Sequence, residues 1–147
     1  MKAAQAGQGR IFVLRLEHGE VVHEAVEAFC RREGIRAAEV SVLGGVDDGS
    51  RLVVGPRDGQ ARPIEPVLAT LEGVHEATGT GTVFPDENGN PILHLHLACG
   101  RGTGTVTGCA REGVITWHVL EVILREIESA TSRRRRDPET GFELLVP

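Results

Sequence analysis

The chain has 147 residues, 40% of them hydrophobic and 25% charged, which suits one globular domain and is too short for two independent cores. Its formal net charge of −5 provides no overall attraction to the phosphates of nucleic acids. The longest apolar runs are far shorter than the roughly 20 residues that a membrane-spanning helix needs, so no membrane partner is expected.

Residues 1–9 are small and polar and include two glycines, so a mobile N-terminal tail is predicted, followed by a single domain over residues 10–147. The tail has no apolar segment of the kind that secretory signals contain, and a cytoplasmic location is expected. The three cysteines are an odd number in a chain that is long enough to build its own core. They are therefore expected to be reduced thiols rather than a disulfide framework.

The first two regular elements are predicted to be a strand and a helix. Arg10–Leu16 is rich in β-branched and aromatic residues, a composition typical of a strand. In Glu20–Arg32 the apolar side chains recur at helical spacing. Gly34 stands just beyond that segment, where a glycine favours the end of a helix.

From residue 37 onward, short apolar segments alternate with glycine-rich turns, a pattern that predicts a series of strands. The expected strands cover residues 38–46, 51–55, 66–74, 78–84, 91–98 and 103–110. The turn Pro85–Asn90 has dense turn chemistry and is expected to join two antiparallel strands. Val114–Ile127 also fits a helix, but Val, Ile, Thr and Trp dominate its first half, so a strand is favoured.

The principal chemical feature of the sequence is the pair His94 and His96 within the predicted strand of residues 91–98. Alternate residues of a strand point to the same face, so both imidazoles project from one face. The opposite face carries side chains that would enter a core: Leu93, Leu95 and Leu97. Two imidazoles side by side on a strand are a common way to offer two nitrogens to a metal ion. The alternative is that they line a polar sheet face or a subunit contact.

A third metal ligand is predicted from the next strand. If Arg101 and Gly102 form a two-residue turn, Cys109 lies directly opposite His94, and Thr107 lies opposite His96. A slip of one residue would move Cys109 to the other face, so the prediction depends on the register. Two histidines and one cysteine are a plausible Zn²⁺ set that leaves the fourth position open.

The other histidines and cysteines and the basic run are expected to have ordinary structural roles. His75 and His118 are expected to pack with normal hydrogen bonds, and His18 and His23 to be solvated near the start of the helix. Two cysteines are expected to be buried in the core: Cys30 and Cys99. The run Arg133–Arg136 is followed by acidic residues and is expected to form a solvated or ion-paired edge.

A further set of short motifs occurs in order along the chain, and their order and spacing together are more specific than any one of them. They are Arg15-Leu16, Gly19-Glu20, Gly44-Gly45, Glu76 ahead of Gly79, the segment from Pro91 to His96, the segment from Gly104 to Cys109, Glu121-Val122-Ile123, and the segment from Arg136 to Gly141. With this series, residues 10–146 resemble the PPC domain, which is found alone in prokaryotes and joined to AT-hooks in plant nuclear proteins.

The resemblance implies an α+β fold with a mainly antiparallel β-sheet, one principal packed α-helix and assembly as a homotrimer. Prokaryotic members commonly carry a His-x-His motif followed by Gly-Gly-His, and some look like metal-binding proteins through these histidines. Cys109 stands where the third histidine would be, and its thiolate favours softer ions. The chain has no AT-hook core of the Arg-Gly-Arg-Pro type. No settled biochemical activity comes with the family.

The leading hypothesis is a trimeric PPC-like protein that binds zinc through His94, His96 and Cys109 and has an unknown small-molecule or regulatory role. One alternative is a metal-dependent hydrolase acting on a small molecule, with Glu76 and His118 as the residues to examine for a general base. Another is a DNA-associated or transcription-related accessory protein, as the plant relatives suggest. A third is a structural or interaction module in which assembly is the function.

Overall fold

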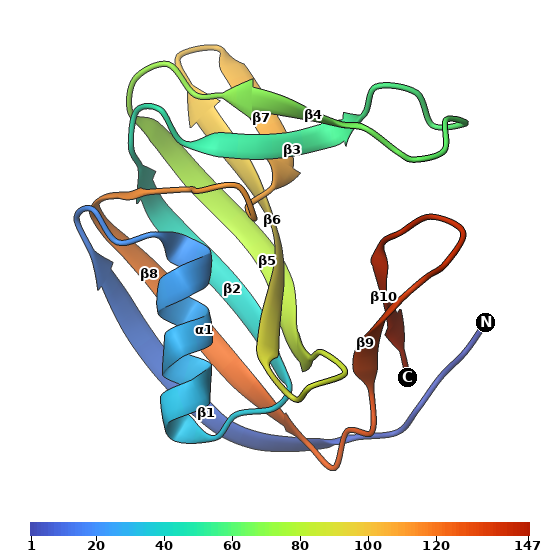
Figure 1. Cartoon of the computed structure of the whole chain (residues 1–147). Helices are drawn as coiled ribbons and strands as arrows, with labels where there is room; N and C mark the ends of the chain where they lie inside the picture. The colour runs from blue at the N-terminus through green and yellow to red at the C-terminus, as the bar shows by residue number, and fades with distance from the viewer.

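The computed structural model describes residues 1–147, which form one α-helix and ten β-strands (Figure 1). In chain order the elements are β1 (Gly7–Glu17), α1 (Val22–Glu33), β2 (Ala38–Val46), β3 (Arg51–Pro56), β4 (Pro66–Thr70), β5 (His75–Pro85), β6 (Pro91–Arg101), β7 (Gly104–Cys109), β8 (Thr116–Glu128), β9 (Arg133–Arg136) and β10 (Glu143–Val146).

Eight strands form one antiparallel sheet in the order β1-β8-β2-β5-β6-β7-β3-β4. The strands β9 and β10 pair with each other in a separate hairpin, and β9 contacts β5. The single helix lies along one side of the sheet, and the hairpin lies beside the end of β5 and β6 (Figure 1). The predicted α+β fold, a mainly antiparallel sheet with one packed helix, is confirmed.

Helix α1 forms where the sequence predicts it because its apolar residues recur every four positions. Val22, Val26 and Cys30 are fully buried against the apolar face of the sheet, which confirms Cys30 as a core residue. Gly34 ends the helix at φ 68°, and its N–H bonds back to the last turn. The helix has 12 residues, and no helix of the structure is long and apolar enough to cross a membrane.

The bounds of most strands differ by a few residues from the sequence prediction; for example, β4 ends at Thr70 rather than at residue 74, and β5 begins at His75 rather than at residue 78. Strand β1 begins at Gly7, three residues earlier than predicted, so part of the expected tail pairs with β8. The ambiguous segment Val114–Ile127 becomes strand β8, as favoured, because its inward residues fill the core between β1 and β2. The division into a tail and one domain stays a prediction.

The sheet face away from α1 carries a row of directly opposed residues that runs across six strands. From β7 to β1 the row consists of Cys109, His96, Thr80, Ser41, Ile123 and Val13. The next residues along the strands point to the opposite face and, apart from the glycines of β5, pack in or against the core with α1. The histidine face predicted from the sequence is therefore the face that the helix leaves uncovered.

Candidate metal centre

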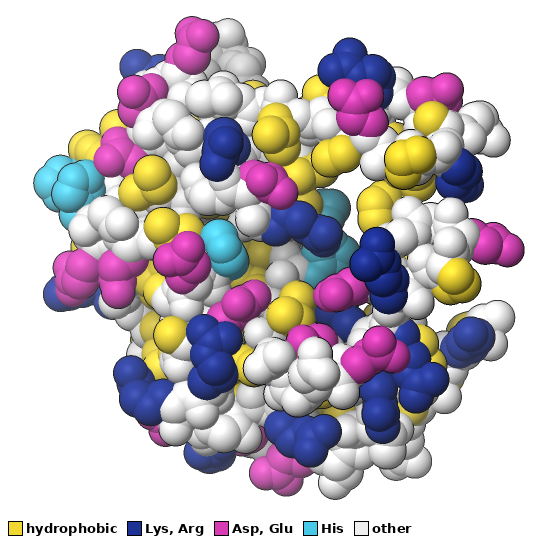
Figure 2. Space-filling model, viewed as in Figure 1, with side chains coloured by type: hydrophobic (Ala, Val, Ile, Leu, Met, Phe, Trp, Pro, Cys, Tyr) yellow, Lys and Arg dark blue, Asp and Glu magenta, His cyan; other side chains and the backbone are white.

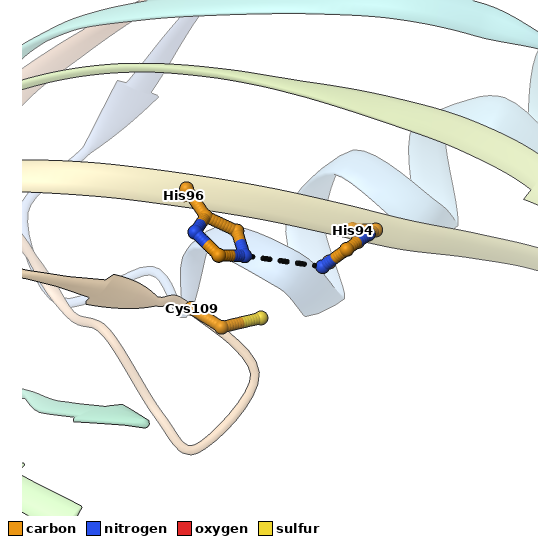
Figure 3. Close-up of side chains that lie close together, drawn as sticks. All are labelled: His94, His96 and Cys109. Carbon is orange, nitrogen blue, oxygen red and sulfur yellow. Dashed lines mark hydrogen bonds between the residues drawn. The ribbon is translucent and has the colours of Figure 1, made fainter. Parts of the chain in front are cut away.

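His94 and His96 project together from β6 on the side opposite the core. Their neighbours Leu93, Leu95 and Leu97 are at most 6% exposed, which confirms the predicted division of the strand into a polar and an apolar face. His94 is half-buried and His96 is exposed. The two imidazoles lean toward each other and toward the side chain of Cys109 at the end of β7 (Figure 3).

The register of the β6–β7 hairpin differs from the predicted one. Cys109 lies opposite His96 rather than His94, and Thr107 lies opposite Ala98. The turn consists of Gly102 and Thr103, not Arg101 and Gly102, because glycine takes the first central position with φ 59°. The error is two residues, and side chains alternate with a period of two, so Cys109 remains on the histidine face.

The three side chains have the spacing of ligands around one ion. The Nε2 atoms of His94 and His96 are 3.2 Å apart, and the ligand atoms of both histidines and Cys109 lie within 4.8 Å of one another. Two nitrogens bound tetrahedrally to one zinc would be about 3.3 Å apart, given the usual Zn–N distance. The donor set and its geometry therefore fit a zinc ion without rearrangement of β6.

Cys109 is held by a cationic neighbour. Its side chain is 6% exposed, and Nε of Arg111 donates a hydrogen bond to Sγ at 3.2 Å. Arg111 thus holds the Cys109 side chain in place from the loop that follows β7.

The end of β7 leaves the histidines accessible. The last contact of this segment with β6 is the hydrogen bond from the N–H of Ala110 to the carbonyl of Leu95. Beyond it, the N–H of Leu93 donates to the Glu27 carboxylate of α1 at 2.9 Å instead of to a strand. Because no strand covers this edge of β6, His94 opens onto a pocket.

The backbones of β5 and β6 approach each other closely beside the two histidines. A Cβ added at Gly81 would overlap the carbonyl oxygen of His94 and stand 2.8 Å from Cα of Leu95. A Cβ added at Gly79 would overlap the carbonyl oxygen of His96. Glycine at these two positions lets β6 sit where both imidazoles reach the same point.

Burial and nearby cations keep His94 in its neutral, metal-binding form. Desolvation lowers the pKa of His94 from 6.5 to about 4, and the positive charges of Arg134 and Arg111 and the neighbouring His96 lower it further. A neutral imidazole offers a lone pair to a metal, whereas a protonated one does not. His94 is thus able to bind a metal in weakly acidic as well as neutral solution.

The lowered pKa of His94 predicts a pH dependence of stability in zinc-free protein. Between pH 6.5 and about 4 the unfolded chain takes up a proton at His94 that the folded chain refuses, so acidification lowers the free energy of unfolding. Urea unfolding across this range measures the effect. In His94→Gln, the number of protons taken up on unfolding should be smaller than in the wild type by up to about one, so the unfolding free energy should depend less on pH. An unchanged slope in His94→Gln, or an equal loss in the exposed control His18→Gln, would contradict the assignment.

A pocket of about 480 Å³ lies over the three metal-ligand candidates. On this face of the molecule, histidine atoms lie at the bottom of a hollow with basic side chains beside them (Figure 2). The pocket is lined by the two histidines and Cys109, by Arg111 and Glu143, and by a largely apolar wall of Val53, Val54, Gly55, Thr107, Gly108, Phe142 and Leu144.

The residues considered for a general base do not reach this pocket. Glu76 pairs with Gly100, four residues along β6 from His96, and its side chain is exposed. His118 is exposed, has a positive φ of 55° and packs against Trp117. It is not among the residues that line the pocket. The carboxylate that lines the pocket is Glu143 of β10.

The structural roles expected for the remaining residues are partly confirmed. Cys99 is buried in the core, and His75 is buried with Nδ1 2.9 Å from the carbonyl of Gly73. His23 was expected to be solvated, and that expectation is wrong, because its Nδ1 is buried and without a partner. The three cysteines are free thiols.

The basic run does not form a uniform solvated edge, and that expectation is wrong for Arg134. As β9 is a strand, alternate side chains point to opposite sides, and Arg134 turns inward and is 6% exposed. Its Nη2 donates to Oγ1 of Thr82, the residue directly opposite His94 on β5. Strand alternation within Arg133–Arg136 predicts that the four arginines do not all face the same way, but it does not indicate which of them lies at the site.

Comparison with known proteins gives one family and several similar structures. The sequence pattern of the Plants and Prokaryotes Conserved (PCC) domain matches residues 3–128, which include both histidines and Cys109. The segment from Arg136 to Gly141, part of the motif series above, lies beyond the matched residues. No protein of curated function matches the chain.

The similar structures extend over nearly the whole chain. A metal-containing protein from Archaeoglobus fulgidus is 26% identical, with a TM-score of 0.84 and coverage of 100% of both chains. A plant- and prokaryote-conserved (PPC) protein from Pyrococcus horikoshii is 23% identical, with a TM-score of 0.80 over 98% of this chain and 99% of the other. A candidate DNA-binding protein from Bacteroides thetaiotaomicron is 18% identical, with a TM-score of 0.76 over 96% of both chains.

Proposed function

Because the chain belongs to the Plants and Prokaryotes Conserved (PCC) domain family, we propose that it is a zinc-binding member of that family, with His94, His96 and Cys109 as ligands. The observation that carries the proposal is the convergence of these three donors on one point. The 3.2 Å separation of the two imidazole nitrogens is that expected for two ligands of one tetrahedral ion. The metal-containing protein from A. fulgidus, 26% identical, supports the proposal by similarity.

The donor set favours zinc over harder divalent ions. Imidazole and thiolate ligands suit zinc, whereas magnesium and calcium prefer oxygen ligands. Three protein ligands leave one tetrahedral position free, as in zinc sites that act on a ligand rather than closed structural ones. When bound there, zinc would supply a Lewis acid at the bottom of the pocket. The protein itself holds the ligands on β6 and β7 and shapes an apolar wall around the free position.

Zinc titration of protein purified without an affinity tag tests the proposal. One zinc per chain is expected, and at a free concentration about 1,000 times Kd the melting temperature should rise by roughly 8–16 °C, because the ion binds only the folded chain. Magnesium serves as the control and should leave the melting temperature unchanged. Absence of zinc uptake by folded, metal-free protein would refute the proposal.

The proposal includes assembly as a homotrimer. On the sheet face away from α1, the strands β1, β8 and β2 present apolar side chains to solvent, with Val13 77% and Leu43 61% exposed. Exposed apolar side chains on a continuous sheet face are typical of subunit contacts. Sedimentation equilibrium should give the mass of three 15.8 kDa chains, and a monomer at micromolar concentration would overturn this part of the proposal.

The competing functions receive less support from the geometry. The hydrolase hypothesis relied on Glu76 or His118, neither of which lines the pocket. The similarity to the candidate DNA-binding protein, at 18% identity, extends to the fold alone. A basic face for DNA would use the arginine run, but Arg134 is turned into the molecule. The free zinc position and its pocket therefore favour a small molecule as the ligand.

A further inference from the structure

A second pocket, of about 130 Å³, adjoins the metal centre on the side of α1 and β9. It shares three residues with the larger pocket, namely His94, Arg111 and Glu143. Its other lining residues are His23, Glu27, Ile92, Leu93 and Arg134. A water molecule occupies about 30 Å³ of liquid, so the space holds a few waters or a group of the size of a carboxylate.

Arg134 brings a buried and incompletely bonded guanidinium to this second pocket. Its side chain is 6% exposed, Nη2 donates to Thr82, and Nε has no hydrogen-bond partner. A buried donor without a partner costs about 1–3 kcal/mol, and more when it is charged. Arg134 lines the pocket, so its guanidinium is a group that a polar ligand entering there would meet.

His23 provides a second incomplete polar atom in the same place. Three buried side-chain polar atoms of the chain lack a partner, and two of them, Nδ1 of His23 and Nε of Arg134, belong to residues that line this one pocket. They come from α1 and β9, elements far apart in the sequence. Both atoms are closed off from solvent, so the coincidence shows two incompletely hydrogen-bonded polar side chains in the wall of one pocket.

The second pocket offers guanidinium groups to an anion, and two carboxylates, Glu27 and Glu143, also line it. Arg134 and Arg111 provide two guanidinium groups. The Glu27 carboxylate is engaged, because it accepts from Leu93 N–H and lies 4.0 Å from Arg31. Glu143 is the remaining carboxylate; it forms no ion pair within 4.0 Å, but its negative charge acts on Arg134 and offsets part of the positive charge there. A planar guanidinium binds a carboxylate through two parallel hydrogen bonds, which makes a carboxylate the matching partner.

The larger pocket determines what the rest of such a ligand must be. Val53, Val54, Phe142 and Leu144 line it, so the body of the ligand meets an apolar wall. We propose that the second pocket is a carboxylate subsite, and that the protein binds a small carboxylic acid whose apolar body lies in the larger pocket beside the metal centre. The inference deepens the proposed zinc function and rests on it only for the neighbouring ion.

Calorimetric titration with 3-phenylpropionate tests the subsite, using the full chain both metal-free and loaded with zinc. Binding of one molecule per chain is expected in both forms. Binding to the metal-free form would show that the carboxylate is not simply coordinated by zinc. The neutral amide 3-phenylpropanamide should bind at least about tenfold more weakly, because it lacks the charge that the guanidinium recognises. The proposal would be overturned if acid and amide bound with equal affinity, or if the acid did not bind at concentrations up to about 10 mM.

Variants locate the carboxylate within the molecule. Arg134→Gln should weaken 3-phenylpropionate binding about tenfold or more, whereas the exposed neighbour in Arg135→Gln should leave it unchanged. Glu143→Gln should strengthen binding, because it removes a negative charge that faces the anion. If Arg134→Gln does not fold, His23→Ala carries the same test and should weaken binding about threefold or more. Wild-type affinity in folded Arg134→Gln or His23→Ala would place the acid elsewhere.

The outcomes separate this inference from the proposed function. If zinc does not bind but metal-free protein takes up the acid, the zinc proposal fails and the subsite stands. If zinc binds and the acid does not, only the subsite fails. Inorganic phosphate is titrated in parallel, and tighter binding of phosphate than of 3-phenylpropionate would overturn the assignment to a carboxylate.

Discussion

Cys109→Ala is expected to weaken zinc binding about a hundredfold or more while leaving the chain folded. The variant removes the thiolate and leaves two imidazoles on β6, which are too few to hold the ion firmly. The side chain is 6% exposed and lies at the end of β7, at the bottom of the pocket rather than in the main core, so a stable fold is expected. Competition with a chromogenic chelator measures the affinity.

A matched control and a rescue sharpen the test of Cys109. Thr107 also lines the pocket from β7, and Thr107→Ala should bind zinc as tightly as the wild type. Cys109→His offers an imidazole from the same strand position and should recover much of the lost affinity. Wild-type zinc affinity in Cys109→Ala would remove the cysteine from the ligand set and leave the centre without a third protein donor.

Gly81→Ala is expected to lower the free energy of unfolding by about 1–3 kcal/mol or more, the usual cost of forcing extra volume into a packed site. The added methyl group would overlap the carbonyl oxygen of His94 and press on Cα of Leu95, both of which are backbone atoms of β6. Backbone cannot rotate away as a flexible side chain does. Strand β6 must therefore shift, and the shift moves the His94 imidazole off the common point.

Urea denaturation and zinc titration measure the two consequences of Gly81→Ala. Gly59→Ala is the matched control, because nothing lies within 4 Å of its Cβ position and its φ is not in the left-handed region. This control should stay within about 0.5 kcal/mol of the wild type and bind zinc normally. If Gly81→Ala were as stable as Gly59→Ala, the close approach of β5 and β6 would not be what positions the histidines.

The sequence predicts local features of the site well because they depend on alternation alone. The side chains of His94 and His96 share a face, and Leu95 enters the core, for any strand that covers residues 91–98. The end of α1 at Gly34 follows equally from local conformation. These features needed no knowledge of which strands are neighbours.

The register of the β6–β7 hairpin could not be predicted from the sequence, because the sequence does not show which two residues form the turn. Either Arg101 or Gly102 could begin a two-residue turn, and the choice moves Cys109 by two positions along β6. The positive φ of Gly102 at the first turn position decides it. Because both choices keep Cys109 on the histidine face, its proximity to the two histidines was predictable, while its pairing partner was not.

The second pocket was not predictable because its members meet only in three dimensions. His23 lies at the start of α1, and Arg134 lies in a run that resembles a solvated edge when read as charge alone. The tertiary packing of β9 against β5 turns one arginine of four inward. No pattern within either segment indicates that the two side chains line one cavity.

Anomalous X-ray scattering at the zinc edge, from crystals of protein purified without an affinity tag and supplied with one equivalent of zinc, tests the central claim most directly. The account predicts one strong peak per chain, within about 2.0–2.4 Å of both imidazole Nε2 atoms and Sγ of Cys109, with a fourth position open to the pocket. A peak elsewhere, or none between these three side chains in zinc-supplied crystals, would contradict it.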